Sequence, residues 1–209
     1  MYIPGPFASP HHEATLSLVE KTGFGQLVTN GSDGLIASHL PMQLDRTRNV
    51  LIGHLAGPNP QTDHLAACAK AGTAVLAMFE GPHGYVSPSW YAPTNKSVPT
   101  WNYAAAHVYG VPRLITDKAA LHGLVDNLAK QYERLGWHIE AQDKAYIDTM
   151  LGGIVGFELA ISRIEGKFKL SQNRNATDRA NVIAALAASG NADDAALAEL
   201  MQSHLEKGK

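Results

Sequence analysis

The sequence lacks the features that mark secreted and membrane-spanning proteins. Cys68 is the only cysteine among 209 residues, so no internal disulfide can form, and a reducing compartment suits the chain best. The first twelve residues hold no positively charged region followed by an apolar run, as a secretory signal peptide would. No apolar run approaches the roughly 20 residues that a transmembrane helix needs. We therefore expect a soluble, cytoplasmic protein.

An excess of positive charge is also missing. The chain has 17 Lys and Arg against 19 Asp and Glu, which gives a net charge of −2. A domain that binds nucleic acid unaided usually carries a basic patch, and no convincing helix-turn-helix pattern is present either. The composition therefore gives little support to direct DNA binding.

Common catalytic motifs are absent as well. The sequence contains neither the G-x-G-x-x-G that follows a Rossmann strand nor the P-loop pattern, and no serine lies in a G-x-S-x-G elbow. Ten histidines invite a metal site, yet no pair has metalloprotease spacing and the single cysteine has no partner. We predict no metal site, and we interpret the four histidines of the predicted barrel as hydrogen-bonding or core residues: His39, His54, His64 and His83.

Short strands joined by tight turns are the main pattern that is present. Strands are predicted at 24–30, 35–42, 50–55, 73–79, 104–114 and 154–161. Helices are predicted at 13–22, at 62–71 with a Thr62 or Asp63 cap, from Thr116 or Asp117 onward, around 146–151, and twice after Thr177. Consecutive hairpins favour an antiparallel barrel over a doubly wound sheet. We expect one α+β domain over residues 1–209, with helices inserted at about 117–151 and a helical tail from about 177.

The stretch from Gly81 to Gly110 is unusually rich in aromatic residues. It holds two of the three Trp and four of the seven Tyr, alternating with Ser, Thr and Asn, including Thr94 and Asn95. Such a mixture suits a pocket for a planar heteroaromatic ligand. It equally suits a hairpin whose aromatic rings close one end of a barrel. The residues alone do not decide between the two.

The segment Gly166–Arg174 (GKFKLSQNR) is the other unusual stretch, because it gathers two lysines and an arginine directly after the last predicted strand. Such runs are most often solvated turns. The alternative is an anion site, since Lys and Arg pair with phosphate or with pyrimidine carbonyls. Lys70 is the only Lys or Arg between Asn49 and Asn95. A phosphate near the central strands would therefore need histidine, backbone N–H groups, or cations from elsewhere, such as a partner subunit.

Several motifs occur together in one order: MYIP, FGQLVT, SHLP, GHLA, NPQ, GPHGYVSPSWY, VPTWNY, IVGFE and KLSQNR. From Met1 to about Arg179 the chain resembles the PaiB-type family of FMN-binding negative transcriptional regulators. The resemblance implies an antiparallel split β-barrel related to pyridoxamine phosphate oxidase and flavin reductases. It also implies a homodimer that holds FMN in a groove at the subunit interface.

The resemblance nominates three groups of cofactor-binding residues. For the phosphate and ribityl chain they are Ser38, His39, Pro41, Gly53, His54, Asn59 and Gln61. For the isoalloxazine ring they are Ser87, Thr100, Trp101 and Asn102, and reaching across the dimer they are Lys169, Ser171, Gln172, Asn173 and Arg174. One departure lies at the phosphate end, where Gly57-Pro58 stands in place of a bulky or basic residue.

Three functions stay open at this point. A regulatory flavoprotein would transfer electrons or hydride through the cofactor's own chemistry, so no dedicated catalytic residues need appear in the sequence. A direct DNA-binding repressor would have no redox role and would gather its cations from both subunits. A third reading is a split barrel that binds another planar cofactor, such as haem or a deazaflavin.

Overall fold

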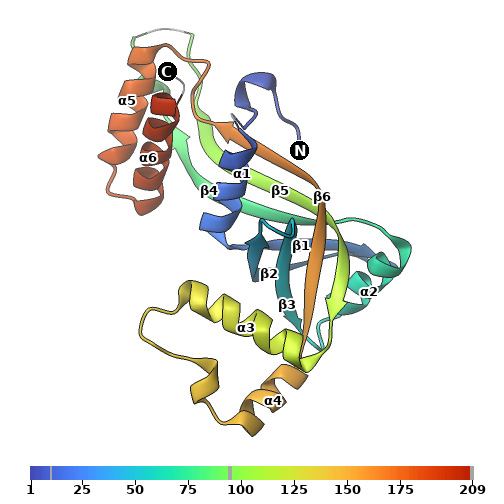
Figure 1. Ribbon diagram of the computed structural model, residues 1–209. Helices are drawn as coiled ribbons and strands as arrows, with labels where there is room; N and C mark the ends of the chain where they lie inside the picture. The colour runs from blue at the N-terminus through green and yellow to red at the C-terminus, as the bar shows by residue number, and fades with distance from the viewer. Residues whose placement is uncertain (10, 94–95, 208–209) are drawn as a thin grey trace. The chain divides into compact units, whose positions relative to one another are not determined.

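The computed structural model describes residues 1–9, 11–93 and 96–207 (Figure 1). The strands are β1 (Phe24–Gly31), β2 (Gly34–Asp45), β3 (Val50–Ala56), β4 (Val75–Val86), β5 (Thr100–Ile115) and β6 (Ile154–Lys169). The helices are α1 (His12–Thr22), α2 (Gln61–Ala71), α3 (Lys118–Tyr132), α4 (Lys144–Gly152), α5 (Ala176–Ala187) and α6 (Ala192–Lys207). Short 3-10 turns lie at η1 (Gly5–Phe7), η2 (Pro88–Trp90) and η3 (Ile139–Ala141).

The six strands form a closed barrel in the order β1-β2-β3-β6-β5-β4. β1 and β2 form a hairpin closed by Gly31 opposite Gly34, and β3 pairs antiparallel with both β2 and β6. The barrel closes where β1 pairs antiparallel with β4. The predicted fold class, an antiparallel barrel with helical additions, is confirmed.

The chain divides into two compact units. The barrel unit comprises Val19–Phe79 and His107–Ile164, to which all six strands contribute. The terminal unit comprises Met1–Leu18, Glu80–Ala106 and Glu165–Lys209. The remaining ends of β4, β5 and β6 therefore belong to the terminal unit.

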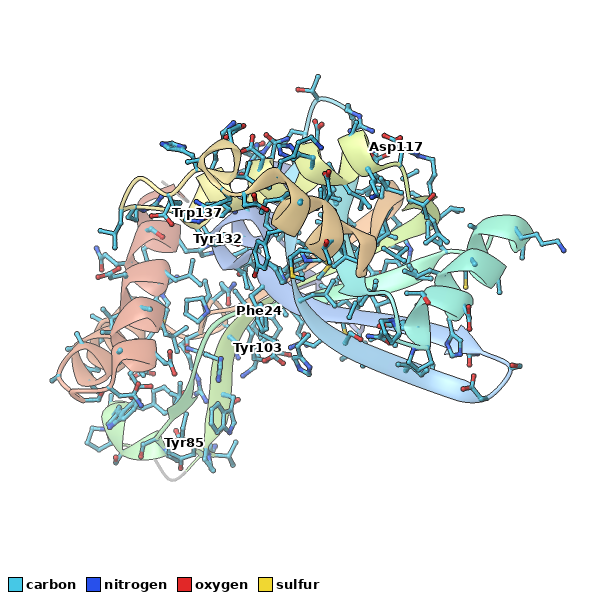
Figure 2. The ribbon with its side chains drawn as sticks, turned by 90° about the horizontal axis from the view of Figure 1, so that it is seen from below. Phe24, Tyr85, Tyr103, Asp117, Tyr132 and Trp137 are labelled. Atoms are coloured by element: carbon cyan, nitrogen blue, oxygen red, sulfur yellow. The ribbon has the colours of Figure 1, made fainter. Side chains whose placement is uncertain are left out.

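The core of the barrel unit follows from strand alternation. Phe79, Phe157, Leu27, Leu51 and Leu159 are fully buried, and burying each contributes roughly 1.5–3 kcal/mol. Outside the barrel, a second apolar cluster packs α3 and α4 around Leu121, Leu124, Leu151 and Ile115. Asp117 caps α3 by accepting a hydrogen bond from Ala120 N, as predicted, and Figure 2 shows Asp117 and Tyr132 at its two ends.

The start of α2 corrects one expectation. The helix begins at Gln61, and neither Thr62 nor Asp63 caps it. Instead, the Asn59 side chain accepts a hydrogen bond from Gln61 N at 2.9 Å, while Thr62 Oγ1 donates to Asn59 O. The Asn59 side chain therefore accepts from the first free N–H of the helix, that of Gln61. Pro60, which lies between them, has no N–H that needs a partner.

The terminal unit packs α5 and α6 together around buried Val182, Leu186, Leu197 and Met201. Gly84 of β4 allows this packing, because a Cβ there would lie 3.0 Å from Leu197 Cδ2. The first nine residues contain η1 and a bridge from Ala8 to Lys167.

Three strands run further into the terminal unit than the sequence predicts. β4 continues through Gly81-Pro82 to Val86, β5 begins at Thr100, and β6 continues to Lys169. The segment Gly166–Lys169 is therefore strand and not a solvated turn. Packing explains the extension of β6: Phe168 is buried, and Gly166 is so close to Thr15 that a Cβ would lie 2.1 Å from its Oγ1.

Candidate functional site

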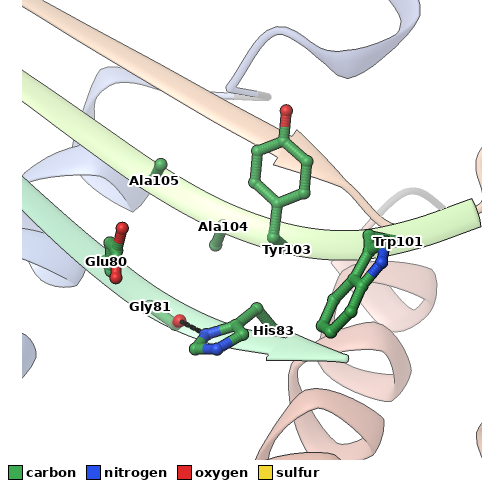
Figure 3. A pocket seen from close by; sticks show the side chains of 7 residues that line it. All are labelled: Glu80, Gly81, His83, Trp101, Tyr103, Ala104 and Ala105. Atoms are coloured by element: carbon green, nitrogen blue, oxygen red, sulfur yellow. Dashed lines mark hydrogen bonds between the residues drawn. The ribbon is translucent and has the colours of Figure 1, made fainter. Parts of the chain in front are cut away.

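A pocket of about 310 Å³ lies on the β4 and β5 segments of the terminal unit. Its lining residues are Glu80, Gly81, His83, Trp101, Tyr103, Ala104 and Ala105 (Figure 3). Gly81, Ala104 and Ala105 are small residues of this lining, and its Trp and Tyr side chains come from β5. The volume lies in the range of small-molecule sites in proteins.

The rings around the pocket are exposed to an unusual degree. Trp101 is 55% exposed, with the His83 ring 6.3 Å away at 32° and the Tyr85 ring 6.2 Å away in an edge-on arrangement. Strand alternation buries Asn102 on the opposite face of β5. Trp101 is thus not sealed into a core, and its exposed ring favours the ligand-pocket reading of this stretch over the barrel-closing one.

Lys169 joins the end of β6 to the start of β5. Its ammonium donates to Thr100 Oγ1 at 2.5 Å and to the Trp101 carbonyl, and it lies 5.9 Å from the Phe7 ring centroid. Burial lowers the pKa of this ammonium, and the nearby charges of Lys167 and Arg174 lower it further. A lysine has three N–H donors, and the described residues accept from two of them, so the third is available to a ligand beside Trp101.

Asn102 and Ser171, two nominated residues, meet on the buried side of β5. Asn102 Nδ2 donates to Ser171 Oγ at 2.9 Å and also contacts Met201 Sδ. Ser171 has a left-handed backbone with φ 62°, and Arg174 N donates to its carbonyl. The buried Asn102 Oδ1 finds no hydrogen-bond partner among the described residues. An unpaired buried acceptor of this kind is uncommon in folded proteins.

The rest of the KLSQNR segment is held by local contacts. Gln172 accepts a hydrogen bond from Leu170 N and donates to the Phe168 carbonyl, which fastens the turn. The Arg174 guanidinium lies 4.2 Å over the Tyr91 ring, and Asn173 is exposed.

Ser87, nominated for the ring site, caps η2 by accepting from Ser89 N. Thr94 and Asn95 lie outside the described residues. Thr100, Trp101, Asn102, Lys169 and Ser171 are thus brought together within the terminal unit.

The residues nominated for the phosphate and ribityl chain belong to the barrel unit. Asn59 Nδ2 donates to Ser38 Oγ at 3.0 Å, and the fully buried Gln61 donates to the Leu27 and Ile36 carbonyls. These bonds fasten the Gly57-Pro58 loop to β1 and β2.

The loop has few donors left for an anion. Gly57 N donates to Gly153 O, Asn59 N to Ala56 O, and Gln61 N to Asn59 Oδ1, while the two prolines carry no N–H. A phosphate at this loop would therefore rely on side chains.

The remaining nominated residues of this group lie on β2 and β3. His39 is exposed and stacks on Phe24, whose backbone is paired with that of Pro41. Gly53 faces the barrel interior, where a Cβ would lie 2.7 Å from Phe157 Cζ. Burial lowers the pKa of His54, whose Nδ1 has no hydrogen-bond partner among the described residues, so this imidazole is neutral at physiological pH.

Glu80, His83 and Tyr103 line the pocket but were not nominated from the sequence. The strand was expected to end at Phe79, which left Glu80 and His83 outside it. Lys167 is a neighbour of the pocket, with its Nζ 5.2 Å over the Tyr103 ring. Extending the alternation of β4 past Pro82 would have placed His83 and Tyr85 on one face.

Comparisons with known proteins identify the family of the chain. A family described as “Putative FMN-binding domain” matches residues 1–163. The chain is 38% identical over 212 residues to the protease synthase and sporulation protein PAI 2 of Bacillus subtilis (strain 168), and 99% of each chain is covered.

Solved structures show the same fold at low identity. The flavocytochrome Anf3 from Azotobacter vinelandii has a TM-score of 0.59 at 13% identity, covering 83% of this chain and 75% of that one. The FAD and haem binding protein from Mycobacterium smegmatis has a TM-score of 0.58 at 16% identity, covering 82% and 78%. In the part of the chain that the structure describes, no helix is long and apolar enough to cross a bilayer.

Proposed function

Because the chain belongs to the family of FMN-binding domains, whose cofactor is FMN, we propose that its exposed aromatic face on β4 and β5 holds the flavin ring for electron or hydride transfer. The observation that carries the proposal is the pocket beside Trp101. When bound, FMN supplies the electron-transfer chemistry, and the chain's own residues bind and orient it.

Residues at the pocket match both the apolar faces and the polar edge of a flavin ring. The flat apolar faces of an isoalloxazine match the exposed indole of Trp101 and the Tyr103 ring. The polar edge of the ring carries carbonyl oxygens, which accept hydrogen bonds from cations. Lys169 retains one donor beside Trp101 and holds its positive charge without a carboxylate partner among the described residues.

For the phosphate and ribityl chain we propose the nominated barrel-unit residues that are not buried in the core, namely Ser38, His39, Pro41, His54 and Asn59; Gly53 faces the barrel interior and Gln61 is fully buried. The backbone donors of the Gly57-Pro58 loop are already used within the chain. Cations from a second copy would complete such a site, and the 55% exposure of Trp101 fits a face that a partner covers. We therefore propose a homodimer with FMN at its interface. A mass of twice the chain is expected in solution, and a monomer at micromolar concentration would contradict it.

For the cellular role, we propose a regulator that acts in the cytoplasm through its flavin and does not bind DNA directly. The Bacillus subtilis relative is named for protease synthesis and sporulation. Net charge is −2, and Arg46, Arg48 and Arg113 each pair with a carboxylate, which leaves them poor phosphate contacts. A salt-dependent shift of promoter DNA by the purified protein would overturn this part of the proposal.

The test is a titration of the protein with FMN, followed by flavin fluorescence. Trp101→Leu should weaken FMN binding about 10-fold and reduce quenching, because the stacked indole is lost. Trp137→Leu is the matched control, since Trp137 is also partly exposed, at 40%, but lies in the barrel unit. Equal quenching in wild type and Trp101→Leu would exclude the proposed ring site. An absorbance scan of the same samples distinguishes flavin from haem.

A further inference from the structure

The helices α5 and α6 lie side by side and are joined by residues 188–191, so they form a helical hairpin (Figure 1). The seam between them consists of four buried apolar residues, Val182, Leu186, Leu197 and Met201. Arg179 lies three residues before Val182, and His204 lies three residues after Met201. Because residues three apart share one face of a helix, both side chains continue the seam at the end away from the turn.

Arg179 carries a positive charge that the described part of the chain does not neutralise. Its Nε is buried and has no hydrogen-bond partner among the described residues. The adjacent Asp178 carboxylate accepts instead from Ala92 N and Asn175 Nδ2, and no carboxylate of the described residues pairs with the Arg179 guanidinium. A guanidinium stays charged and only donates, so a buried N–H without an acceptor is costly. An anion at this end of the hairpin would supply the missing acceptor.

Two histidines lie near this charge. Burial lowers the pKa of the half-buried His204, and the charges of Arg179 and His11 lower it further. Such an effect requires short separations, because salt screens charges more than about 10 Å apart. His11 stands directly before α1, and all three residues belong to the terminal unit. N–H donors from α5, α6 and the start of α1 are therefore gathered in one place.

We propose that Arg179, His204 and His11 form an anion site that takes a phosphate group, either as inorganic phosphate or as the phosphate of a small metabolite. A guanidinium matches two phosphate oxygens at once. Donors from three elements suit the several oxygens of a tetrahedral dianion better than those of a planar carboxylate. None of the three residues lines the pocket beside Trp101, so this site is separate from the one proposed for the flavin ring.

A titration with inorganic phosphate tests the proposal, followed by the imidazole signals of the protein in NMR spectra. The signal that is lost in His204→Gln should shift saturably in wild type. In Arg179→Gln the affinity read from this signal should fall about 10-fold, because the charge-assisted hydrogen bonds are lost. Arg134→Gln is the matched control, since Arg134 is exposed in the barrel unit and donates to the carbonyls of Gln131 and Glu133. It should bind phosphate as wild type does.

Two further ligands identify the chemistry that the site prefers. Glycerol 3-phosphate should bind more tightly than inorganic phosphate if the ligand is a phosphate ester, and more weakly if it is the free ion. Either result supports a phosphate site. Acetate should cause no saturable shift of the His204 signal. Acetate that binds as tightly as phosphate would overturn the assignment to phosphate.

Urea unfolding separates a binding role of Arg179 from a structural one. Without an added anion, Arg179→Met should be at least as stable as wild type, because it removes an unpaired, partly buried charge. Phosphate should then raise the unfolding midpoint of wild type and Arg134→Gln more than that of Arg179→Met, since a ligand stabilises only the state that binds it. An equal rise in all three proteins, or an unchanged phosphate affinity in Arg179→Gln, would overturn the inference.

Discussion

The two units of the molecule neutralise their positive charges in different ways. In the barrel unit, Arg46 forms a two-bond pair with Glu20, while Arg48 and Arg113 share Glu158. Two lysines there also pair with aspartates four residues away. Arg163 also contacts a ring, with its guanidinium 3.6 Å over Tyr109.

In the terminal unit, three cations lie on aromatic rings and neutral oxygens. Lys167 lies over Tyr2 and Tyr103, Arg174 lies over Tyr91, and Lys169 bonds to Thr100 and the Trp101 carbonyl. Within the described ranges, none of the three forms an ion pair. A carboxylate cancels a charge, whereas a ring or carbonyl leaves it available to an anion. Among the described residues, the terminal unit does hold one ion pair, between the Met1 ammonium and Glu165, so the contrast concerns the three side-chain cations, to which our proposed function gives ligand binding.

Gly53→Ala should show the largest effect on stability. Its Cβ would lie 2.7 Å from Phe157 Cζ and 3.2 Å from Met42 Cγ, both in fully buried side chains. We expect a loss of up to about 3 kcal/mol in urea unfolding. Gly123→Ala is the control, because its Cβ meets nothing within 4 Å in α3. A stable Gly53→Ala protein that binds FMN poorly would instead make Gly53 a cofactor contact.

Glu158→Gln should destabilise the barrel unit by about 2 kcal/mol at neutral pH. Burial alone would raise the pKa of Glu158, but hydrogen bonds from Arg113 and Arg48 outweigh it and lower the pKa. The folded state therefore favours the ionised form, and its contribution is lost as the pH falls through that lowered pKa. Urea unfolding at several pH values should show wild type and variant converging in acid. A constant difference would contradict the ion-pair account.

The smallest effect is expected at His54. Its pKa is lowered by burial, so the unfolded chain binds a proton that the folded chain does not. Stability is then complete above the ordinary histidine pKa of about 6.5 and declines as the pH falls below it. His54→Leu should reduce that slope by at most about 1.4 kcal/mol per pH unit. An unchanged slope would show that other groups cause the acid sensitivity.

Local patterns predicted the barrel well. The alternating apolar residues Phe157 and Leu159 predicted a strand, and both side chains are fully buried. The Asp117 cap was also predictable, because it depends only on residues within one helical turn. The strand ends were not predictable in this way. β4 and β6 were expected to end at Phe79 and Ile161, yet contacts with residues distant in the sequence, such as that of Gly166 with Thr15, accompany the longer strands. The composition of KLSQNR suggested an anion site. The partner of Lys169 could not be predicted, because Trp101 is 68 residues away in the sequence and only the fold brings the two together.

The most direct test compares one lysine from each unit in an FMN titration. Lys169→Met should weaken FMN binding about 10-fold, because a charge-assisted hydrogen bond to the flavin's polar edge is lost. Lys130→Met, which breaks the pair with Asp126 in the barrel unit, should leave the affinity unchanged. In wild type, the affinity should also fall as the pH rises through the lowered pKa of Lys169, since the charged form binds. Equal affinity in both variants would contradict the division of roles between the two units.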